Sequence, residues 1–316
     1  MNKLLVCVSD SFDPYFNQGL EKHLLEQVGT DSLILYLWQN DRTVVIGRNQ
    51  DAYAECRITE LTNDGGHLAR RLSGGGAVFH DKGNLNYTFI APKNRFDIPL
   101  NSEIVLDAVA SFGLYADLSG RNDMVIDGRK FSGTAYYRTE AGCLHHGTLL
   151  ISGDFELMRK YLAVSESKLK KNAVQSVRSR VVNLRELNPA VSVDLMKERL
   201  IASFGRRYGA KVELISAPPA VLEREFFENT EWILGRKPHF NRVFECQFPF
   251  GNFKLALMVK EGVICDAELY TDAMDAEGYH ELCERLKGLP LSKSSIETVF
   301  KDESRELIEW LIREVV

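Results

Sequence analysis

The chain has 316 residues, among them 39 Lys and Arg against 44 Asp and Glu, which gives a formal net charge of −5. Hydrophobic residues make up 45% and charged residues 26%, a mixture that is typical of a folded globular protein and too apolar for a disordered one. The acidic balance disfavours a general nucleic-acid-binding surface, and no apolar run approaches the roughly 18 residues that a membrane span needs.

The cysteines and the first apolar run indicate the compartment. The six cysteines are scattered with no Cys-x-x-Cys pair, which argues against a disulfide framework and against a zinc site. The apolar run at residues 4–8 is followed by Ser9, Asp10 and Ser11 and is too short for a signal peptide. We therefore expect a cytoplasmic protein that engages neither membranes nor nucleic acid, with a monomer as the default.

The first part of the chain is predicted to form a helix followed by several strands. Asp13 and Pro14 are typical of a helix start, with Asp as the N-cap and Pro in the first turn. Residues 102–112 have the apolar spacing of a second helix, with Ser102 as its N-cap. Apolar and partly β-branched runs between polar turns predict strands over residues 33–38, 43–46, 68–72, 77–80 and 86–91.

The remaining elements point to an α+β fold. Asp127-Gly128 lies between two strand-like runs and strongly indicates a hairpin. Hairpin signals outnumber strand–helix–strand crossovers, so we predict mixed, mostly antiparallel sheets packed by helices. We expect a larger domain over residues 1–245 and a small C-terminal α+β domain over residues 250–316. Further predicted elements are strands over residues 143–151, 253–260 and 263–270 and helices over residues 154–162, 193–208, 220–233, 275–286 and 294–315.

Three consecutive glycines, residues 74–76, follow Arg70 and Arg71 and form the most informative stretch. Without Cβ atoms, their N–H groups are free to converge on an anion, or a ligand can lie against bare backbone. The two arginines supply bidentate donors for phosphate or carboxylate. The alternative is a flexible hairpin turn with two solvated arginines. A P-loop and a dinucleotide fingerprint are both excluded, because neither Gly-Lys-Ser/Thr nor Gly-x-Gly-x-x-Gly is present here.

Lys130 immediately follows the predicted hairpin tip and leads into a segment of small residues where a ligand could approach the chain. A lysine there could serve as a point charge for a phosphate or a carboxylate, although standing alone it would more often be an exposed hairpin residue. Asn122-Asp123 offers hard oxygen ligands suited to magnesium, while a lone Asp is usually only a turn residue.

Two further stretches carry polar groups. His145 and His146 interrupt an apolar strand, and side-chain alternation sends them to opposite faces, so they cannot chelate one metal together. One histidine is expected to face a pocket and the other to lie in the core or on the surface. Residues 176–184 follow three lysines and form either a basic, solvated face or a loop that closes over a polyanion.

Taken in order, these motifs resemble those of the bacterial lipoate–protein ligase A family. They are Arg-Arg-x-Ser-Gly-Gly-Gly-Ala-Val-Phe-His-Asp at 70–81, Asp-Gly-Arg-Lys-x-Ser-Gly-x-Ala at 127–135, His-His-Gly-Thr-Leu-Leu at 145–150 and Ser-Val-Arg-Ser-Arg-Val at 176–181. The resemblance covers nearly the whole larger domain, and the tail from Phe250 is similar, more weakly, to the family's accessory domain.

The resemblance implies an ATP-dependent ligase of two half-reactions. Lipoate attacks the α-phosphate of ATP to give lipoyl-AMP and pyrophosphate, and a specific lysine of a lipoyl domain then attacks the mixed anhydride. The implied acceptors are the E2 subunits of 2-oxoacid dehydrogenases and the glycine cleavage H protein, and the implied cofactors are ATP, as substrate, and Mg²⁺. Positioning and charge stabilisation must supply most of the acceleration, because little covalent enzyme chemistry is needed.

The resemblance also implies roles for individual residues. Lys130 is the expected catalytic residue, where the α-phosphate meets the lipoate carboxylate, and Asp123 is the candidate magnesium contact. The expected ATP-binding residues are Arg71, Gly76, Ala77, Val78, Phe79 and Lys130. The expected lipoate-binding residues are Lys130, Arg70, Ser73, Gly75 and His146, with Leu72, Val78 and Leu149 as an apolar lining. The expected adenylate-binding loop contributes Ser176, Arg178, Arg180 and Val181.

Two other functions stay open. An octanoyl or lipoyl transferase of the same superfamily would use a cysteine thioester and no ATP, and Cys143 is the cysteine closest in sequence to a pocket motif. No adjacent base is signalled for it, so a buried inert thiol is favoured. A binding protein that has lost catalysis is disfavoured by the joint presence of Arg71, the glycine triplet and Lys130.

Overall fold

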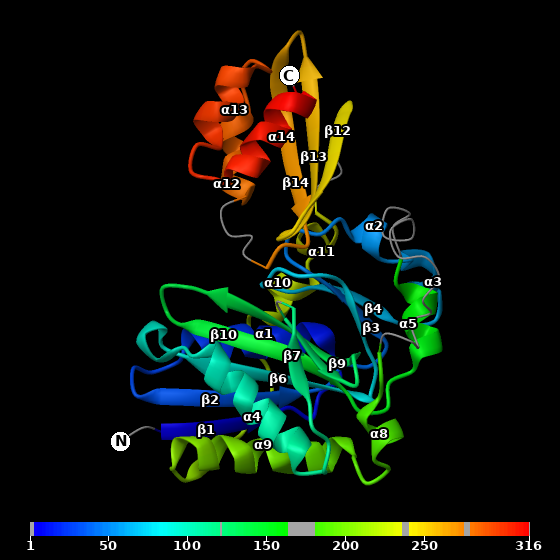
Figure 1. Cartoon of the computed structure of the whole chain (residues 1–316), viewed down its shortest axis with the longest axis vertical. Helices are drawn as coiled ribbons and strands as arrows, with labels where there is room; N and C mark the ends of the chain where they lie inside the picture. Colours follow the sequence, from blue (N-terminus) through cyan, green and yellow to red (C-terminus); the bar gives the residue numbers. More distant parts are fainter. Residues whose placement is uncertain (1–2, 121, 164–180, 236–239, 275–278, 316) are drawn as a thin grey trace.

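The computed structural model describes residues 3–120, 122–163, 181–235, 240–274 and 279–315. The larger, N-terminal part holds an eight-stranded sheet and a three-stranded sheet, and a second three-stranded sheet with three helices forms the smaller part at the opposite end of the molecule (Figure 1). This arrangement confirms the predicted α+β class.

The eight-stranded sheet has the order β11-β1-β2-β6-β10-β9-β8-β7. Only the pairs β11–β1 and β1–β2 are parallel, and the other pairs are antiparallel, so the sheet is mixed and mostly antiparallel as predicted. Its strands are β1 (Lys3–Val8), β2 (Ser32–Trp38), β6 (Asn84–Ala91), β7 (Asp117–Ser119), β8 (Asp123–Ile126), β9 (Arg129–Arg138), β10 (Cys143–Leu150) and β11 (Val212–Ile215).

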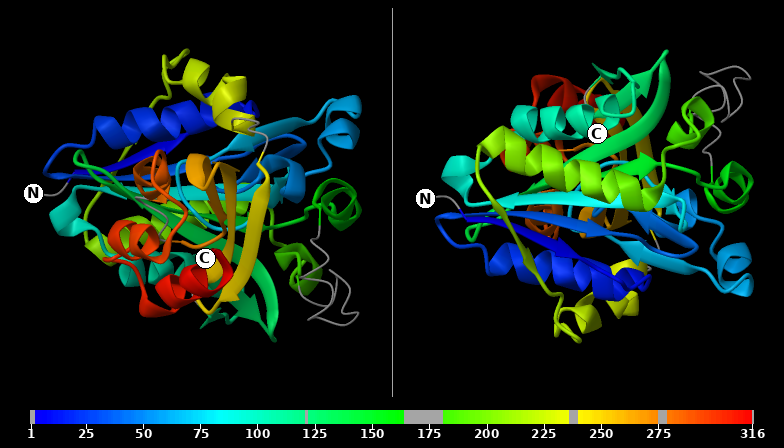
Figure 2. Two further views of the ribbon diagram at one scale, coloured as in Figure 1. Left: turned by 90° about the horizontal axis from the view of Figure 1, so that it is seen from above. Right: turned by 90° about the horizontal axis from the view of Figure 1, so that it is seen from below.

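Helices cover both faces of this sheet. Figure 2 shows α1 (Pro14–Glu26) on one face and α4 (Ile98–Ala110) with α9 (Val193–Tyr208) on the other. Each face therefore has its own apolar core, one centred on Leu20, Tyr36 and Ile90 under α1 and the other including Phe89 and Phe204. Burial of these side chains supplies the main favourable free energy of the fold.

The second sheet of the larger part has the order β4-β3-β5, with β3 (Thr43–Ile46) in the middle. β4 (His67–Arg70) pairs with β3 in parallel, and β5 (Val78–His80) pairs with its other edge antiparallel. The glycine triplet therefore connects two strands that never pair with each other. The alternative of a hairpin turn at this point is wrong, because β3 lies between the two strands.

Local signals placed some helix ends correctly and others wrongly. Asp13 and Asp154 cap α1 and α5 (Phe155–Tyr161) as predicted, each by accepting hydrogen bonds from two main-chain N–H groups. The helix predicted from Ser102 begins four residues earlier, because Asp97 accepts from the N–H of Leu100 and Pro follows in the first turn.

Two predicted long helices are each broken in two. The predicted helix over residues 220–233 is α10 (Arg224–Glu228) and α11 (Thr230–Leu234), and Asn229 between them caps the second with its side chain. The helix predicted over residues 294–315 is α13 (Lys293–Val299) and α14 (Arg305–Val315). Other short helices among the described residues of the larger part are α2 (Ala52–Glu55), α3 (Ile58–Asn63), a 3₁₀ turn (Lys93–Arg95) and α8 (Leu184–Leu187).

The smaller part is an antiparallel sheet, β12 (Arg242–Phe248), β13 (Gly251–Lys260) and β14 (Val263–Thr271), covered by α12 (Tyr279–Leu286), α13 and α14. Its own core includes Phe253, Phe300 and Trp310. β12 lies across the predicted domain boundary at residues 245–250 and pairs with β13 along its whole length, so the sheet of this part begins at Arg242.

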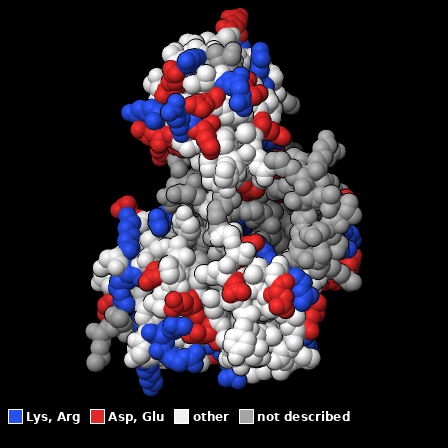
Figure 3. All heavy atoms as spheres, in the orientation of Figure 1, with Lys and Arg blue, Asp and Glu red and all other residues white. Residues whose placement is uncertain are grey.

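The surface shows no segregation of charge on the face drawn in Figure 3, where acidic and basic side chains are interspersed over both parts. Among the described residues, no helix is long and apolar enough to cross a membrane.

Candidate active site

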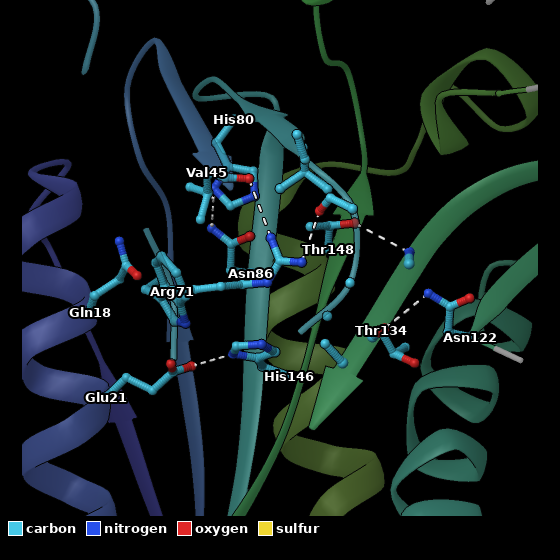
Figure 4. Close-up of a pocket in the computed structure, with 18 of the residues that line it drawn as sticks. Gln18, Glu21, Val45, Arg71, His80, Asn86, Asn122, Thr134, His146 and Thr148 are labelled. Atoms are coloured by element: carbon cyan, nitrogen blue, oxygen red, sulfur yellow. Dashed lines mark hydrogen bonds and ion pairs between the residues drawn. The ribbon is translucent and has the colours of Figure 1, made fainter. Parts of the chain in front are cut away.

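A cavity of about 670 Å³, measured out to its open mouth, lies where the glycine segment faces β9 and β10 and where α1 closes the far side (Figure 4). Gln18 and Glu21 lie at one side of the view, and Asn122 and Thr134 lie at the other. The lining residues are Gln18, Glu21, Trp38, Val45, Arg71, Gly75, Gly76, Ala77, Val78, His80, Asn86, Asn122, Lys130, Gly133, Thr134, Ala135, His146, Gly147 and Thr148.

Arg71 fixes the glycine segment by hydrogen bonds to its main chain and to Ser73. Its Nη2 donates to the carbonyls of Gly74 at 2.6 Å and Gly76 at 2.8 Å, and its Nε donates to the Ser73 Oγ at 3.1 Å. Burial lowers the pKa of Arg71 to about 10, so the guanidinium stays charged at neutral pH. A fixed positive charge thus lies beside a cavity wall of bare backbone.

The three glycines of this wall differ in their surroundings and in their backbone angles. A Cβ on Gly74 would collide with the main-chain carbonyl of Ala273, and Gly75 donates its N–H to the same carbonyl at 3.3 Å. Gly75 also has φ +89°, which favours glycine. A Cβ on Gly76 would meet no described atom within 4 Å. Gly74 and Gly75 therefore lie against the smaller part of the molecule, whereas no described atom occupies the space beside the Cα of Gly76.

Lys130 lies on the opposite wall. The hairpin that places it turns at Asp127 and Gly128, which have φ +50° and +73° as the Asp-Gly signal predicted. Its Nζ lies 2.7 Å from Oδ1 of Asp123 on β8, and both side chains are 36% exposed, so the ammonium is partly accessible to a ligand.

The chain returns to Lys130 directly after the undescribed residues 164–180. Val181 forms a parallel bridge with Lys130, and the N–H of Val182 donates to the Lys130 carbonyl at 2.9 Å. Of the predicted adenylate-binding loop, Ser176, Arg178 and Arg180 lie outside the described residues.

A buried polar chain crosses the wall beneath the cavity. The Nδ1 of His146 lies 2.8 Å from Oε1 of Glu21, and its Nε2 lies 2.7 Å from the Ser73 Oγ. The hydroxyl of Thr88 also donates to Oε1 of Glu21, at 2.6 Å. Through Ser73 this chain reaches the Arg71 guanidinium, so α1, β10 and the glycine segment are fixed relative to one another.

His80 and Gln18, which both line the cavity, contain buried polar atoms without a hydrogen-bond partner among the described residues. Burial lowers the pKa of His80 to about 3, and the charge of Arg71 adds to the effect, so its imidazole is neutral at neutral pH. Its Nδ1 faces the amide nitrogen of Asn40 at 3.2 Å and accepts from it, which leaves the proton on Nε2. Neither that Nε2 nor the side-chain amide of Gln18 has a hydrogen-bond partner in the described part of the chain.

The structure brings seven of the predicted site residues to one cavity. Those that line it are Arg71, Gly75, Gly76, Ala77, Val78, Lys130 and His146. Ser73 and Asp123 do not line it but bond directly to His146 and Lys130.

The side chains of four predicted site or lining residues lie away from the cavity lining. Phe79 packs in the core against Tyr161, and Leu72 and Leu149 are buried away from the cavity lining. Arg70 donates to main-chain carbonyls of Gly47, Arg48, Gln50, Trp232 and Ile233. In this conformation its guanidinium therefore holds loops together, and its predicted contact with lipoate stays a prediction.

Sequence reasoning missed Gln18, Glu21, His80 and Asn86 as lining residues. The first two belong to α1 and are buried, with 1% and 2% exposure, although both are polar. Their helical spacing places them near the apolar Leu20 and Leu24, and polar residues on a buried helix face are the signal that could have found them.

The chain matches known families over most of its length. The model of the lipoyl protein ligase A/B catalytic domain matches residues 13–205, and the model of the bacterial lipoate protein ligase C-terminus matches residues 237–311. The chain is 36% identical to lipoate-protein ligase A of Blochmanniella pennsylvanica (strain BPEN), with 100% of both chains covered.

The solved structures that are similar to this one include two lipoate-binding or lipoate-transferring proteins. P. falciparum LipL1 in complex with lipoate has a TM-score of 0.85 and 29% identity, covering 98% of this chain and 100% of that chain. The bi-partite lipoate protein ligase of Thermoplasma acidophilum, described with its E2 lipoyl domain, has a TM-score of 0.64 and 25% identity, covering 75% of this chain and 98% of that chain.

Proposed function

Because this chain belongs to the lipoyl protein ligase A/B family and is a lipoate–protein ligase, we propose that it works in two ATP-driven steps. A carboxylate oxygen of lipoate attacks the α-phosphorus of ATP, the bond from that phosphorus to the bridging oxygen breaks, and pyrophosphate leaves. The amine of an acceptor lysine then attacks the carbonyl carbon of lipoyl-AMP, so that an amide forms and AMP leaves with the bonding electron pair.

The observation that carries this proposal is the position of Lys130 opposite the glycine segment. The first step brings two anions together, a carboxylate and a phosphate, and a fixed ammonium between them lowers their repulsion and stabilises the charge of the transition state. Lys130 is partly exposed in the cavity wall and held by one carboxylate, so it can turn toward a ligand. Lys130 is therefore the proposed catalytic residue.

The nucleotide is proposed to lie along residues 76–79. Gly76, Ala77 and Val78 line the cavity, and we expect their main-chain N–H groups to meet a base edge or a phosphate. Arg71 supports this region by its charge and by its hydrogen bonds to the glycine carbonyls, and it fixes the backbone before the ligand arrives.

The candidate magnesium contact is Asp123, whose carboxylate lies beside the Lys130 ammonium. No group of three or more His, Cys, Asp or Glu side chains that could hold a metal occurs in the parts of the chain that the structure describes. One carboxylate is sufficient where nucleotide phosphates and water complete an octahedral shell. Asp123 is therefore the proposed magnesium contact, and the bound ion would neutralise phosphate charge.

The acceptors are proposed to be lipoyl domains, those of 2-oxoacid dehydrogenase E2 subunits and the glycine cleavage H protein. Residues 176–181 are proposed to cover the adenylate and to shield the anhydride from water. The proposal is supported by Val181, which lies against Lys130, so a loop ending there reaches the reacting groups. We also propose that the protein is a monomer and that it acts in the cytoplasm.

The thioester alternative finds no support in the site. Cys143 is 2% exposed and does not line the cavity. The neighbouring His146 is bonded to Glu21 and Ser73, and neither ring nitrogen of His145 has a partner among the described residues. A cysteine nucleophile needs an adjacent base and access to the acyl carbon.

The decisive experiment is pyrophosphate release from ATP on addition of lipoate, with no acceptor protein present. Lipoate-dependent release is the expected result. Absence of release, together with acyl transfer from an octanoylated carrier protein in the absence of ATP, would replace the adenylate route by the thioester route.

A further inference from the structure

The polar side chain of Gln18 has no role in the chemistry proposed above. Gln18 lies on α1, is 1% exposed and lines the cavity. Within the described residues, neither its Nε2 nor its Oε1 has a hydrogen-bond partner. A buried amide without partners destabilises the fold, so an apolar residue would be the stabilising choice at this position.

The polar groups next to Gln18 are already satisfied. Glu21, one turn further along α1, accepts hydrogen bonds from Thr88 and from His146. The Nε1–H of Trp38, which also lines the cavity, donates to Thr88 at 3.2 Å. Of the buried polar side-chain atoms in the described lining, those of the Gln18 amide and Nε2 of His80 have no partner, and the Gln18 amide is the one that α1 contributes.

The position of Gln18 indicates which part of a ligand it meets. Figure 4 shows Gln18 on α1 at one side of the cavity and Thr134 at the other, on β9, the strand that also carries Lys130. If the carboxylate of the acid lies at Lys130, as the proposed function requires, the acyl chain runs away from β9 and ends near α1.

We propose that Gln18 determines specificity at the far end of the acyl chain and favours lipoate over an eight-carbon fatty acid. This inference rests on the proposed function. A dithiolane sulfur accepts a weak hydrogen bond from the Nε2–H of Gln18, and the thiols of the reduced acid donate weakly to its Oε1. A terminal methyl group does neither and leaves the buried amide unpaired.

A site that hydrogen-bonds its substrate discriminates against an analogue that lacks the bonding group. Because sulfur is a weak partner, we expect the discrimination to be moderate, about tenfold in kcat/KM for lipoate over octanoate. The reduced acid is expected to be used at least as well as lipoate.

The test compares lipoate and octanoate in acid-dependent pyrophosphate release. The variants are Gln18→Met, which is nearly isosteric, Gln18→Leu, and Gln18→Asn, which keeps an amide but withdraws it by one methylene. Gln27→Leu is the matched control, because Gln27 is exposed at the end of the same helix. Equilibrium binding of the two acids, measured by calorimetry, provides a readout that does not depend on turnover.

The Met and Leu variants are expected to bring the lipoate-to-octanoate ratio to within about twofold of one, mainly by improving octanoate, while the control keeps the wild-type ratio. An unchanged ratio in the Met and Leu variants overturns the proposal. An equal decrease of kcat/KM for both acids also overturns it, because Gln18 would then only maintain the structure of the cavity. If those two fail to fold, a ratio unchanged in the Asn variant overturns it.

The failure of the proposed function would look different. A wild-type protein that releases no pyrophosphate with either acid contradicts the adenylate route. The calorimetric ratio of the two acids would then still support or overturn the role of Gln18.

Discussion

The Lys130 Nζ lies 2.7 Å from Oδ1 of Asp123, and the two residues reach each other across the β8–β9 hairpin because Gly133 has no side chain. A Cβ on Gly133 would lie 2.8 Å from that Nζ and 4.0 Å from the carboxylate oxygen. The Asp123 carboxylate thus holds the Lys130 ammonium at the cavity wall, and the lack of a side chain at Gly133 leaves the space that the ammonium occupies.

Replacing Lys130 by Ala should lower kcat for acid-dependent pyrophosphate release by about 10²–10³-fold, because a preorganised charge at the transition state is lost. Folding should survive, since the side chain is 36% exposed. The measurement is pyrophosphate release beside a circular dichroism melt. Lys130→Arg, which keeps the charge, is the comparison, and a Lys130→Ala protein of wild-type rate would remove Lys130 from the mechanism.

Replacing Asp123 by Asn tests the magnesium proposal separately. The Asn variant should need a higher Mg²⁺ concentration for half-maximal pyrophosphate release, because a neutral amide is a weaker ligand for a hard cation. Titration of the rate with Mg²⁺ measures this shift. An Asn variant with a lowered rate but an unshifted Mg²⁺ dependence would assign Asp123 to the positioning of Lys130 alone.

Replacing Gly133 by Ala should lower activity without lowering stability. The added methyl group meets the end of a flexible lysine side chain, so the chain can yield, but Lys130 is displaced from its place. A misplacement of about 1 Å at a reacting group can cost about 10²-fold in rate. Steady-state kinetics measure the activity and a thermal melt measures the stability. Gly29→Ala, at a glycine that does not line the cavity, is the control that should leave the activity unchanged.

Two neighbouring glycines should respond differently to Ala. At Gly74 the methyl group meets the main-chain carbonyls of Ala273 and Met274, so the variant should lose about 1–3 kcal/mol of unfolding free energy. At Gly76 it meets open space in the cavity wall, so stability should hold while KM for ATP or lipoate rises. Chemical denaturation and kinetics on both variants decide this, and equal destabilisation would contradict the assignment.

The protein should lose stability below about pH 6.5 because of two buried neutral histidines. Burial lowers the pKa of His80 and of His145 to about 3. In the unfolded chain each imidazole takes up a proton below about pH 6.5, so the unfolded state binds more protons and is favoured as pH falls. Between pH 7.5 and 5.5, each histidine should lower the free energy of unfolding by about 1.4 kcal/mol.

Urea unfolding at several pH values measures this dependence. His145→Leu should remove about half of the loss, whereas His67→Gln, at an exposed position, should leave it unchanged. Retention of the full pH dependence in the His145→Leu protein would show that this imidazole is not buried in its neutral form.

Several elements of the fold could be predicted because their causes are local. Asp-Pro and Asp-Gly act within a few residues, by capping a first turn and by allowing positive φ, and α1 and the β8–β9 hairpin formed as predicted. The helix over residues 193–208 also agrees with α9, because a long apolar repeat ends at a glycine in the left-handed region.

Predictions failed where a competing local or distant contact decided. Asp97, and not Ser102, caps α4, because its carboxylate reaches the N–H of Leu100. The lining residues Gln18 and Glu21 escaped notice because their surroundings come from other strands, such as Thr88 on β6 and His146 on β10.

The pair Arg70 and Arg71 shows most clearly what each level determined. The sequence by itself joined them to the glycine triplet in one family-specific motif and indicated an anion-binding site with Lys130. Only the tertiary structure separated them. Arg71 lines the cavity, whereas Arg70 donates to the carbonyls of Gly47, Arg48, Gln50, Trp232 and Ile233. The physical reason is that the surrounding carbonyls determine which hydrogen bonds a guanidinium makes. For Arg70 those carbonyls come from segments up to 163 residues away in the sequence.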